Sequence, residues 1–223
     1  MEKLTIKHYQ NLKQIGRGSH GRVYKAYDPI KNRNVAIKEA VKRIKDAEHE
    51  ATVMKAYGKS PFLPTIYDYF EFKNTSFIVM EYIEGKPVGK GDFKRPSEKK
   101  DEKLSVQITI NTLKSLTSIH KGGYIHNDIR PKNIMLQNDN PATLKVIDFT
   151  LAKELSPKHL IQTDLRDAAR LCIFLCHGYF PDSLSELQFK NNKLQSTLLH
   201  FLQHSNETYD QSSDFIAALQ PFV

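Results

Sequence analysis

The sequence predicts an α+β fold in which a β-rich part precedes a helical part. Between residues 9 and 82, short apolar segments rich in β-branched and aromatic residues alternate with turn residues, a pattern typical of strands. After residue 104, apolar residues recur at the i, i+3, i+4 spacing of helices. A polar stretch with seven Lys/Arg and four acidic residues, 86–103, separates the two parts. We expect a single domain over 1–223, with a β-rich lobe at about 9–81, a connection at about 82–103 and a helical lobe at about 104–223.

The composition is typical of a folded protein of the cytoplasm. Hydrophobic residues make up 39% of the 223 residues and charged residues 26%, which is enough for a substantial core. The longest strongly apolar run, 171–176, is too short to span a bilayer, and the first residues lack the pattern of a signal peptide. Cys172 and Cys176 lie one helical turn apart, where free thiols are expected rather than a disulfide or a metal site.

The formal net charge of +8 favours anionic ligands, among them nucleotides, acidic proteins and nucleic acid. The sequence has no clustered aromatic-basic face. Nucleic acid is therefore not the partner we expect, although the charge does not exclude it.

A glycine-rich hairpin is predicted near the N-terminus. The motif G-x-G-x-x-G covers residues 16–21 and lies between a strand at 12–15 and a return strand at 23–27. Glycines without a Cβ allow a sharp bend and a close approach to phosphate oxygens. A dinucleotide-binding unit would instead have this motif at the start of a helix, so that alternative is disfavoured.

A third strand, 35–38, ends in V-A-I-K, and a helix at about 43–57 follows. Ala47, Glu50 and Met54 share one face of this helix, so Glu50 is placed to turn inward and pair with Lys38. Glu48 points elsewhere and is the weaker candidate. The alternative is that Glu50 is an ordinary surface carboxylate. Two further strands are predicted around 66–72 and 76–82.

The helical part begins with a helix at 104–121, which Gly122 and Gly123 end. A short hairpin of Leu136 with 144–147 follows. Asp164 can cap a helix running to about His177. The last predicted helices cover 184–187, 194–203 and 212–219.

The polar residues between these elements suit phosphoryl transfer. Asp128 is followed five residues later by Asn133, and Asp148 comes after a short apolar strand. One carboxylate can receive or orient the proton of an attacking hydroxyl, while an amide oxygen and a second carboxylate can hold magnesium against phosphates. Alone, this spacing could also occur in an ordinary polar turn.

Five separated signals occur in the order found in protein kinases: the glycine hairpin, V-A-I-K, an inward Glu, H-x-D-x-x-x-x-N, and D-F. The chain resembles the protein kinase superfamily over residues 9–220. It looks like a small bacterial serine/threonine protein kinase with a shortened activation segment. The resemblance implies a bilobal fold with a small β-rich N-lobe, one helix in that lobe, and a reduced helical C-lobe. It also implies ATP with Mg²⁺ or Mn²⁺ between the lobes.

The resemblance assigns the catalytic roles to five residues, which are Asp128, Lys38, Arg130, Asn133 and Asp148. Asp128 matches the catalytic aspartate, and Lys38 matches the lysine that positions the phosphates. Asn133 and Asp148 match the two metal ligands. Arg130 stands where these kinases usually have lysine, and a planar guanidinium is not equivalent to an ammonium.

The resemblance also implies a nucleotide site, in which backbone C=O of Glu81 and N–H of Ile83 bind the adenine edge and Met80 is the gatekeeper. Its expected residues are Ile15, Gly16, Gly18, Gly21, Val23, Ala36, Lys38, Glu50, Met80, Glu81, Ile83 and Met135. An internal apolar column is expected from Met54, Ile66, His126 and Phe149. Asp164 resembles the helix aspartate that supports the backbone of the catalytic loop, in addition to its possible capping role.

The chain departs from the family pattern at several positions. Asn127 replaces the arginine of H-R-D, and Thr150 replaces the glycine of D-F-G, which is expected to stiffen the segment behind Asp148. No A-P-E motif lies between Asp148 and Asp164. The arginine that pairs with the glutamate of that motif is not evident near 206–209 either. The usual peptide-docking platform is therefore expected to be missing or reduced.

Three functions remain open. The favoured one is an active protein kinase that phosphorylates Ser or Thr of an unidentified protein. The second is a kinase-fold phosphotransferase for a small molecule. The short activation segment and the H-N-D sequence at 126–128 favour this alternative. The third is a nucleotide-binding pseudokinase, which is disfavoured because every side chain that the chemistry needs is present.

Overall fold

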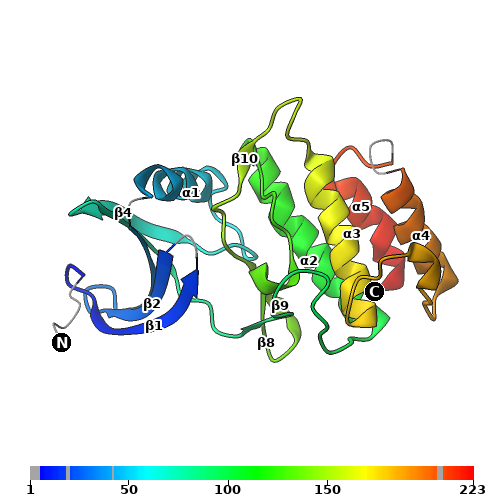
Figure 1. Cartoon of the computed structure of the whole chain (residues 1–223), viewed down its shortest axis with the longest axis horizontal. Helices are drawn as coiled ribbons and strands as arrows, with labels where there is room; N and C mark the ends of the chain where they lie inside the picture. The colour runs from blue at the N-terminus through cyan, green and yellow to red at the C-terminus, as the bar shows by residue number, and fades with distance from the viewer. Residues whose placement is uncertain (1–5, 19–20, 42, 205–207) are drawn as a thin grey trace.

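The structure is a computed structural model that describes residues 6–18, 21–41, 43–204 and 208–223. A lobe built on a β-sheet lies at one end and a helical lobe at the other (Figure 1). The predicted α+β, two-lobed fold is therefore confirmed. Ser19 and His20 of the glycine hairpin lie outside the described residues, as do Asn206 and Glu207.

The N-terminal lobe contains a five-stranded antiparallel sheet with the order β1-β2-β3-β5-β4. Its strands are β1 (Gln10–Gly18), β2 (Gly21–Asp28), β3 (Arg33–Val41), β4 (Ile66–Phe72) and β5 (Thr75–Glu81). Successive residues of the central strand β3 face opposite sides of the sheet. Ile37 packs with Phe77 and Val79 on one side, whereas Lys38 faces the other side, where it meets Glu50.

Helix α1 (Ile44–Ala56) covers that second face of the sheet, in agreement with the predicted helix at 43–57. Its buried residues include Ala47, Glu50 and Met54, the three that the sequence places on one face. The apolar ones belong to a hydrophobic core that continues without a break into the helical lobe. This packing fixes α1, and with it Glu50, relative to β3.

The helical lobe is built around α2 (Glu102–Lys121) and α3 (Ile161–His177), which pack against each other. Helices α4 (Asn192–Gln203) and α5 (Ser212–Leu219) complete it at the far end from the sheet (Figure 1). Asp101 caps α2 by accepting a hydrogen bond of 2.9 Å from Leu104 N.

Short elements between these helices frame the predicted catalytic loop, residues 126–133. One three-stranded sheet contains β6 (Lys86–Pro87), β8 (Ile134–Gln137) and β9 (Asn140–Val146), and one pair contains β7 (Tyr124–Ile125) and β10 (Lys153–Glu154). The described residues also form short 3-10 turns, which are η1 (Pro131–Asn133), η2 (Leu184–Glu186) and η3 (Gln220–Phe222).

Three details of the prediction were wrong. Helix α3 begins at Ile161 instead of at a cap on Asp164, because Asp164 points inward from the first turn. The predicted helix at 184–187 is only the 3-10 turn η2. The connection at 86–103 is not exposed throughout, because Val88 and Phe93 are buried in the main core.

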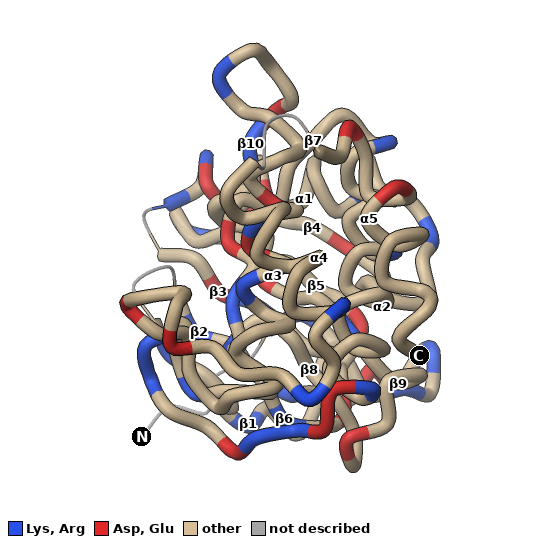
Figure 2. The backbone as a smooth tube through the Cα atoms, turned by 90° about the vertical axis from the view of Figure 1, so that its right-hand side faces the viewer, with Lys and Arg blue, Asp and Glu red and all other residues tan. Residues whose placement is uncertain are grey.

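Charges of both signs are interspersed along the traced chain (Figure 2). Within the described ranges, no helix has both the length and the apolar character needed to cross a bilayer.

Candidate active site

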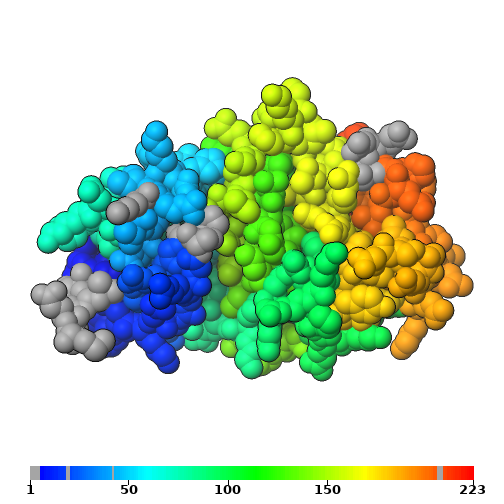
Figure 3. Space-filling view, viewed as in Figure 1, coloured from blue at the N-terminus to red at the C-terminus, as the bar shows by residue number. Residues whose placement is uncertain are grey.

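A cleft of about 350 Å³ lies between the two lobes, which meet where blue and cyan atoms give way to green ones in Figure 3. Eleven of the twelve residues expected to bind the nucleotide line it: Ile15, Gly18, Gly21, Val23, Ala36, Lys38, Glu50, Met80, Glu81, Ile83 and Met135. Gly16 is the exception. Asn133 and Asp148 also line the cleft, whereas Asp128 and Arg130 are not among its lining residues.

Sequence reasoning missed five residues of the lining, most of which neighbour predicted ones: Arg17, Pro64, Tyr82, Lys132 and Ile147. Lys132 adjoins Asn133, and Ile147 adjoins Asp148. A loop or a twisted strand can present adjacent residues to one cavity, so strict alternation along the sequence could not have identified them.

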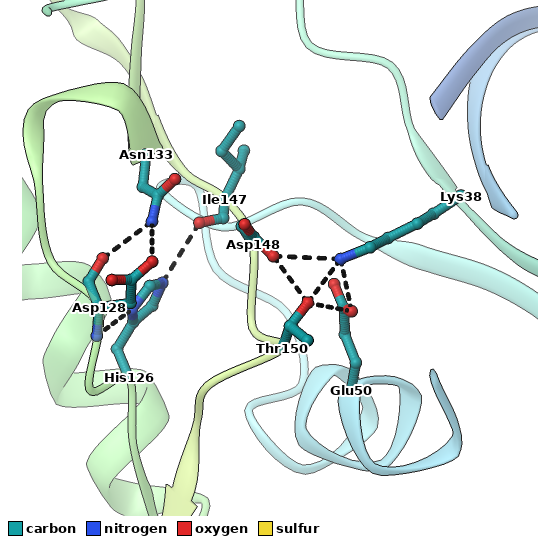
Figure 4. A network of polar contacts seen from close by, with 8 residues as sticks. All are labelled: Lys38, Glu50, His126, Asp128, Asn133, Ile147, Asp148 and Thr150. Carbon is teal, nitrogen blue, oxygen red and sulfur yellow. Dashed lines mark hydrogen bonds and ion pairs between the residues drawn. The ribbon is translucent and has the colours of Figure 1, made fainter. Parts of the chain in front are cut away.

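Four side chains from three chain segments meet beside the cleft (Figure 4). Lys38 Nζ donates to Glu50 Oε2 at 2.7 Å and to Asp148 Oδ1 at 3.1 Å. Thr150 Oγ1 completes the group, at 2.6 Å from Lys38 Nζ and 2.8 Å from both Glu50 Oε2 and Asp148 Oδ1. We call these four residues the lysine cluster. Glu48, the weaker candidate partner of Lys38, is exposed.

Burial and neighbouring charges shift the pKa values of Lys38 and Asp148 in opposite directions. Burial lowers the pKa of Lys38, but the carboxylates of Glu50 and Asp148 outweigh this effect and the pKa is raised overall. Burial raises the pKa of Asp148, but the charge of Lys38 and the hydrogen bonds from Thr150 and Lys38 hold it well below its usual range. Lys38 is therefore an ammonium and Asp148 a carboxylate at neutral pH.

The catalytic loop places Asp128 and Asn133 in direct contact. Asn133 Nδ2 donates to the backbone oxygen of Asp128 at 2.9 Å and to its Oδ2 at 2.8 Å. The guanidinium of Arg130 forms an ion pair with the same carboxylate. Asp128 is 5% exposed, so these contacts compensate the cost of burying its charge.

Asp164 holds the backbone of this loop from helix α3. Its two carboxylate oxygens accept hydrogen bonds of 2.8 Å from the N–H groups of His126 and Asn127. His120 Nε2 lies 2.9 Å from Asp164 Oδ2, which ties α2 to the same anchor. Because Leu160 occupies the N-cap of α3, the alternative that Asp164 is a plain helix cap is wrong.

The arrangement of Asn133 and Asp148 suits a divalent cation shared with phosphates. Both donors of Asn133 Nδ2 point at Asp128, so its Oδ1 faces away from that residue (Figure 4). Asp148 directs one oxygen at Lys38 and the other toward the side of Asn133 (Figure 4). Magnesium typically takes one or two protein oxygens together with phosphates, which these residues could supply.

The three glycines of the hairpin differ in what the fold requires of them. Gly21 has φ of +133°, and a Cβ there would lie 2.0 Å from the Glu39 oxygen, so packing against β3 demands glycine. At Gly16 the nearest atom to a Cβ would be 3.6 Å away, and at Gly18 nothing lies within 4 Å. Packing does not require glycine at these two positions, and of the two only Gly18 lines the cleft.

The connection between the lobes is held by a side chain whose role the sequence did not reveal. Glu81 Oε2 accepts from Thr65 N at 3.1 Å and from Lys145 Nζ at 2.9 Å. Glu81 N–H also donates to Thr65 O at 2.8 Å. These bonds fix the end of β5 at Glu81, whose backbone is expected to bind the adenine edge and which lines the cleft.

The segment after Asp148 is bound to both lobes by hydrogen bonds. Asn127 Nδ2 donates to Leu151 O at 3.0 Å, and His49 Nε2 of α1 lies 2.9 Å from Ala152 O. The strand β10 then pairs with β7. Asn127 has φ of 60°, a region that asparagine adopts more readily than most residues. No motif in the sequence could have predicted the contact of His49, because its partner is a backbone oxygen about a hundred residues away.

The predicted apolar column is brought together in part. Met54, His126 and Phe149 are buried, and the rings of His126 and Phe149 have centroids 5.2 Å apart. His126 therefore has a packing environment, as the sequence predicts. Ile66 packs at the border of the same core and is half-buried.

Comparison with protein families identifies the fold. The protein kinase domain family matches residues 9–168. The chain belongs to this family. The match includes the glycine hairpin, the lysine cluster and the catalytic loop, and ends shortly after Asp164.

The relatives include bacterial and plant kinases. The chain is 31% identical over 170 residues to the probable serine/threonine-protein kinase PknB of Lactococcus lactis, covering 73% of this chain and 26% of the relative. It is 32% identical over 164 residues to a probable serine/threonine-protein kinase of Clostridium acetobutylicum, covering 70% and 24%. Protein kinase PINOID 2 of Arabidopsis thaliana is 29% identical over 171 residues. The chain thus spans about a quarter of the length of the two bacterial relatives.

Proposed function

We propose that the chain transfers the γ-phosphoryl group of ATP, bound with Mg²⁺, to a Ser or Thr hydroxyl of a protein. The observation that carries the proposal is the joint placement of Lys38, Glu50, Asn133 and Asp148 along one cleft. Family membership and the names of the bacterial relatives support protein phosphorylation.

In this proposal Lys38, held by Glu50, positions the phosphates, while Ile15, Val23, Ala36 and Met135 enclose the adenine. A bound Mg²⁺ supplies neutralisation of phosphate charge, and Asn133 and Asp148 would hold it.

Asp128 receives the proton of the acceptor hydroxyl while the hydroxyl oxygen attacks the γ-phosphorus. The bond between the γ-phosphorus and the β-phosphate oxygen breaks, and ADP leaves. Arg130 keeps positive charge beside the same carboxylate.

The direct test is phosphoryl transfer by the purified chain with Mg-ATP labelled in the γ-position and generic protein acceptors. Label should enter protein with the wild type and should be lost with Asp128→Asn, while both proteins bind nucleotide. Wild-type protein that binds Mg-ATP but labels no acceptor of any kind would favour a pseudokinase instead.

A small-molecule acceptor is the second candidate. The observation that favours it is the short segment between Asp148 and Asp164, in which the A-P-E sequence of peptide docking is absent. Parallel assays with protein extract and with a metabolite pool separate the two candidates, because label would enter only one of the two fractions.

A further inference from the structure

Thr150 occupies the position at which the family motif has glycine, and its hydroxyl is the common neighbour of the other three members of the lysine cluster (Figure 4). Those partners come from β3, from α1 and from the segment that carries Asp148. Glu50 is 3% exposed and Lys38 11% at their side chains, so water competes little for these contacts.

A hydroxyl has one proton to donate and two lone pairs with which to accept. Thr150 Oγ1 can accept from the ammonium of Lys38 and donate to either Glu50 or Asp148, both of which lie 2.8 Å away. A glycine offers none of these bonds. One threonine oxygen thus joins a strand and a helix of one lobe to the metal-binding segment of the other.

The same hydroxyl can fix which way Asp148 faces, because Oδ1 of that carboxylate lies 2.8 Å from it and can accept its one proton. Lys38 bonds to the same Oδ1, and the other carboxylate oxygen lies on the side of Asn133 (Figure 4). We propose that Thr150 is a positioning residue, whose hydroxyl holds the Asp148 carboxylate so that its free oxygen and Asn133 Oδ1 together receive a divalent cation. This inference rests on the proposed function, since it assigns a role within the same site.

The backbone around Thr150 is fixed independently of its side chain. The next two carbonyls, of Leu151 and Ala152, are bound by Asn127 at 3.0 Å and by His49 at 2.9 Å. The threonine side chain is therefore presented to the cluster by bonds from both lobes, and a change at its hydroxyl should leave the path of the segment unaltered.

The test is titration of Mg²⁺ in the presence of a non-hydrolysable ATP analogue, with nucleotide binding followed by calorimetry. Thr150→Val has nearly the same shape as threonine but lacks the hydroxyl. It should raise the half-saturating Mg²⁺ concentration about tenfold, as expected for a lost hydrogen bond to a charged group. The affinity of Thr150→Val for the ATP analogue, measured without Mg²⁺, should stay within about twofold of the wild-type affinity. Thr150→Ser restores the hydroxyl and should restore the wild-type metal dependence.

Thr197→Val is the matched control, because Thr197 is half-buried on α4, away from the cleft, and its hydroxyl donates to Lys193 O of its own helix. The half-saturating Mg²⁺ concentration of Thr197→Val should equal that of the wild type. If Thr150→Val does not fold, Thr150→Ala provides the same deletion. Equal metal dependence of wild type and Thr150→Val would overturn the positioning role while leaving nucleotide binding intact. A wild type without metal-dependent binding would instead overturn the proposed function itself.

Discussion

The lysine cluster and the catalytic loop are both needed for the proposed chemistry, but they are held in different ways. Lys38, Glu50, Asp148 and Thr150 come from both lobes and meet through ion pairs and one hydroxyl. The catalytic loop is held within the helical lobe, where Asp164 binds two of its backbone N–H groups. The first arrangement depends on how the lobes are placed, and the second does not.

The difference indicates where activity can be lost without unfolding. A shift of α1 or of the segment after Asp148 would separate members of the lysine cluster, because the four residues are anchored to three different chain segments. The same shift would leave the contacts of Asp128 with Asn133 unchanged, since both residues belong to one loop. Mutations in the two regions should therefore have separable effects on nucleotide binding and on turnover.

The largest effect on turnover should come from replacing Asp128 of the catalytic loop or Asp148 of the lysine cluster. Asp128→Asn should lower kcat by about 10²–10⁴, the usual contribution of a general base, with nucleotide affinity almost unchanged. Asp148→Asn should also abolish turnover, but in addition it should weaken magnesium-dependent nucleotide binding. Single-turnover rates and calorimetric affinities measured on both variants check this. Loss of nucleotide affinity in Asp128→Asn would show that the regions are not separable.

A second variant breaks the cluster through its cation. Lys38→Met leaves the buried Glu50 and Asp148 without their counter-charge. Loss of one partner of a buried ion pair lowers the free energy of unfolding by about 3–5 kcal/mol. We expect a loss near the lower end of this range, because the side chain of Asp148 is 31% exposed. Chemical unfolding at pH 7 measures this difference.

The pH dependence of the same variant follows from the lowered pKa of Asp148. Its contribution to the free energy of unfolding is present above the unfolded value of about 4 and is lost as the pH falls below it. The difference between wild type and Lys38→Met should therefore shrink between pH 5 and about pH 3. A difference that stayed constant over this range would contradict the proposed coupling of Lys38 to Asp148.

A smaller effect is expected when the catalytic loop is loosened from its anchor. In Asp164→Asn one carboxylate oxygen becomes an amide NH₂, so one of the two N–H groups of His126 and Asn127 loses its acceptor. An unsatisfied buried donor costs about 1–3 kcal/mol. Turnover should fall while nucleotide affinity is retained, because the lysine cluster does not contact Asp164.

Asp167→Asn provides the control on the same helix. Asp167 pairs with Arg170 at 3.1 Å, and burial raises its pKa to about 6. Its replacement should leave kcat near the wild-type value. Equal losses of turnover in the two variants would indicate a general effect on α3 instead of a specific effect on the loop.

The two regions also differ in how far the sequence could predict them. The helical periodicity around Glu50 and the predicted V-A-I-K strand that contains Lys38 were sufficient to predict their pairing. The role of Asp164 followed from family resemblance, although its position in the first turn of α3 did not. Periodicity works here because Lys38 and Glu50 each lie within one element whose geometry is regular.

The contacts that close the lysine cluster and its neighbouring segment were not predictable in the same way. Thr150 could be recognised only as a replacement for glycine, since its partners lie up to 112 residues away. The bond from His49 to Ala152 O depends on the placement of α1 against that segment. Lys145 reaches Glu81 across 64 residues. Such bonds are set by tertiary packing, and no local pattern in the sequence encodes them.

The smallest effect is expected at Ser156. In kinases switched by phosphorylation, a basic pocket that includes the H-R-D arginine binds the added phosphate. Here that position is Asn127, which instead donates directly to Leu151 O, and His49 and β7 hold the following residues. Ser156 is exposed and lies in a turn where its backbone pairs with His159.

The segment thus has its anchors without a phosphate, and Ser156→Ala should change kcat by less than about twofold, as for most surface substitutions. Phosphatase-treated wild type should keep its activity as well. A large loss after phosphatase treatment, restored by autophosphorylation in the wild type but not in Ser156→Ala, would show that the lysine cluster does require a switch. The direct bonds from Asn127 and His49 would then be insufficient to hold the two regions together.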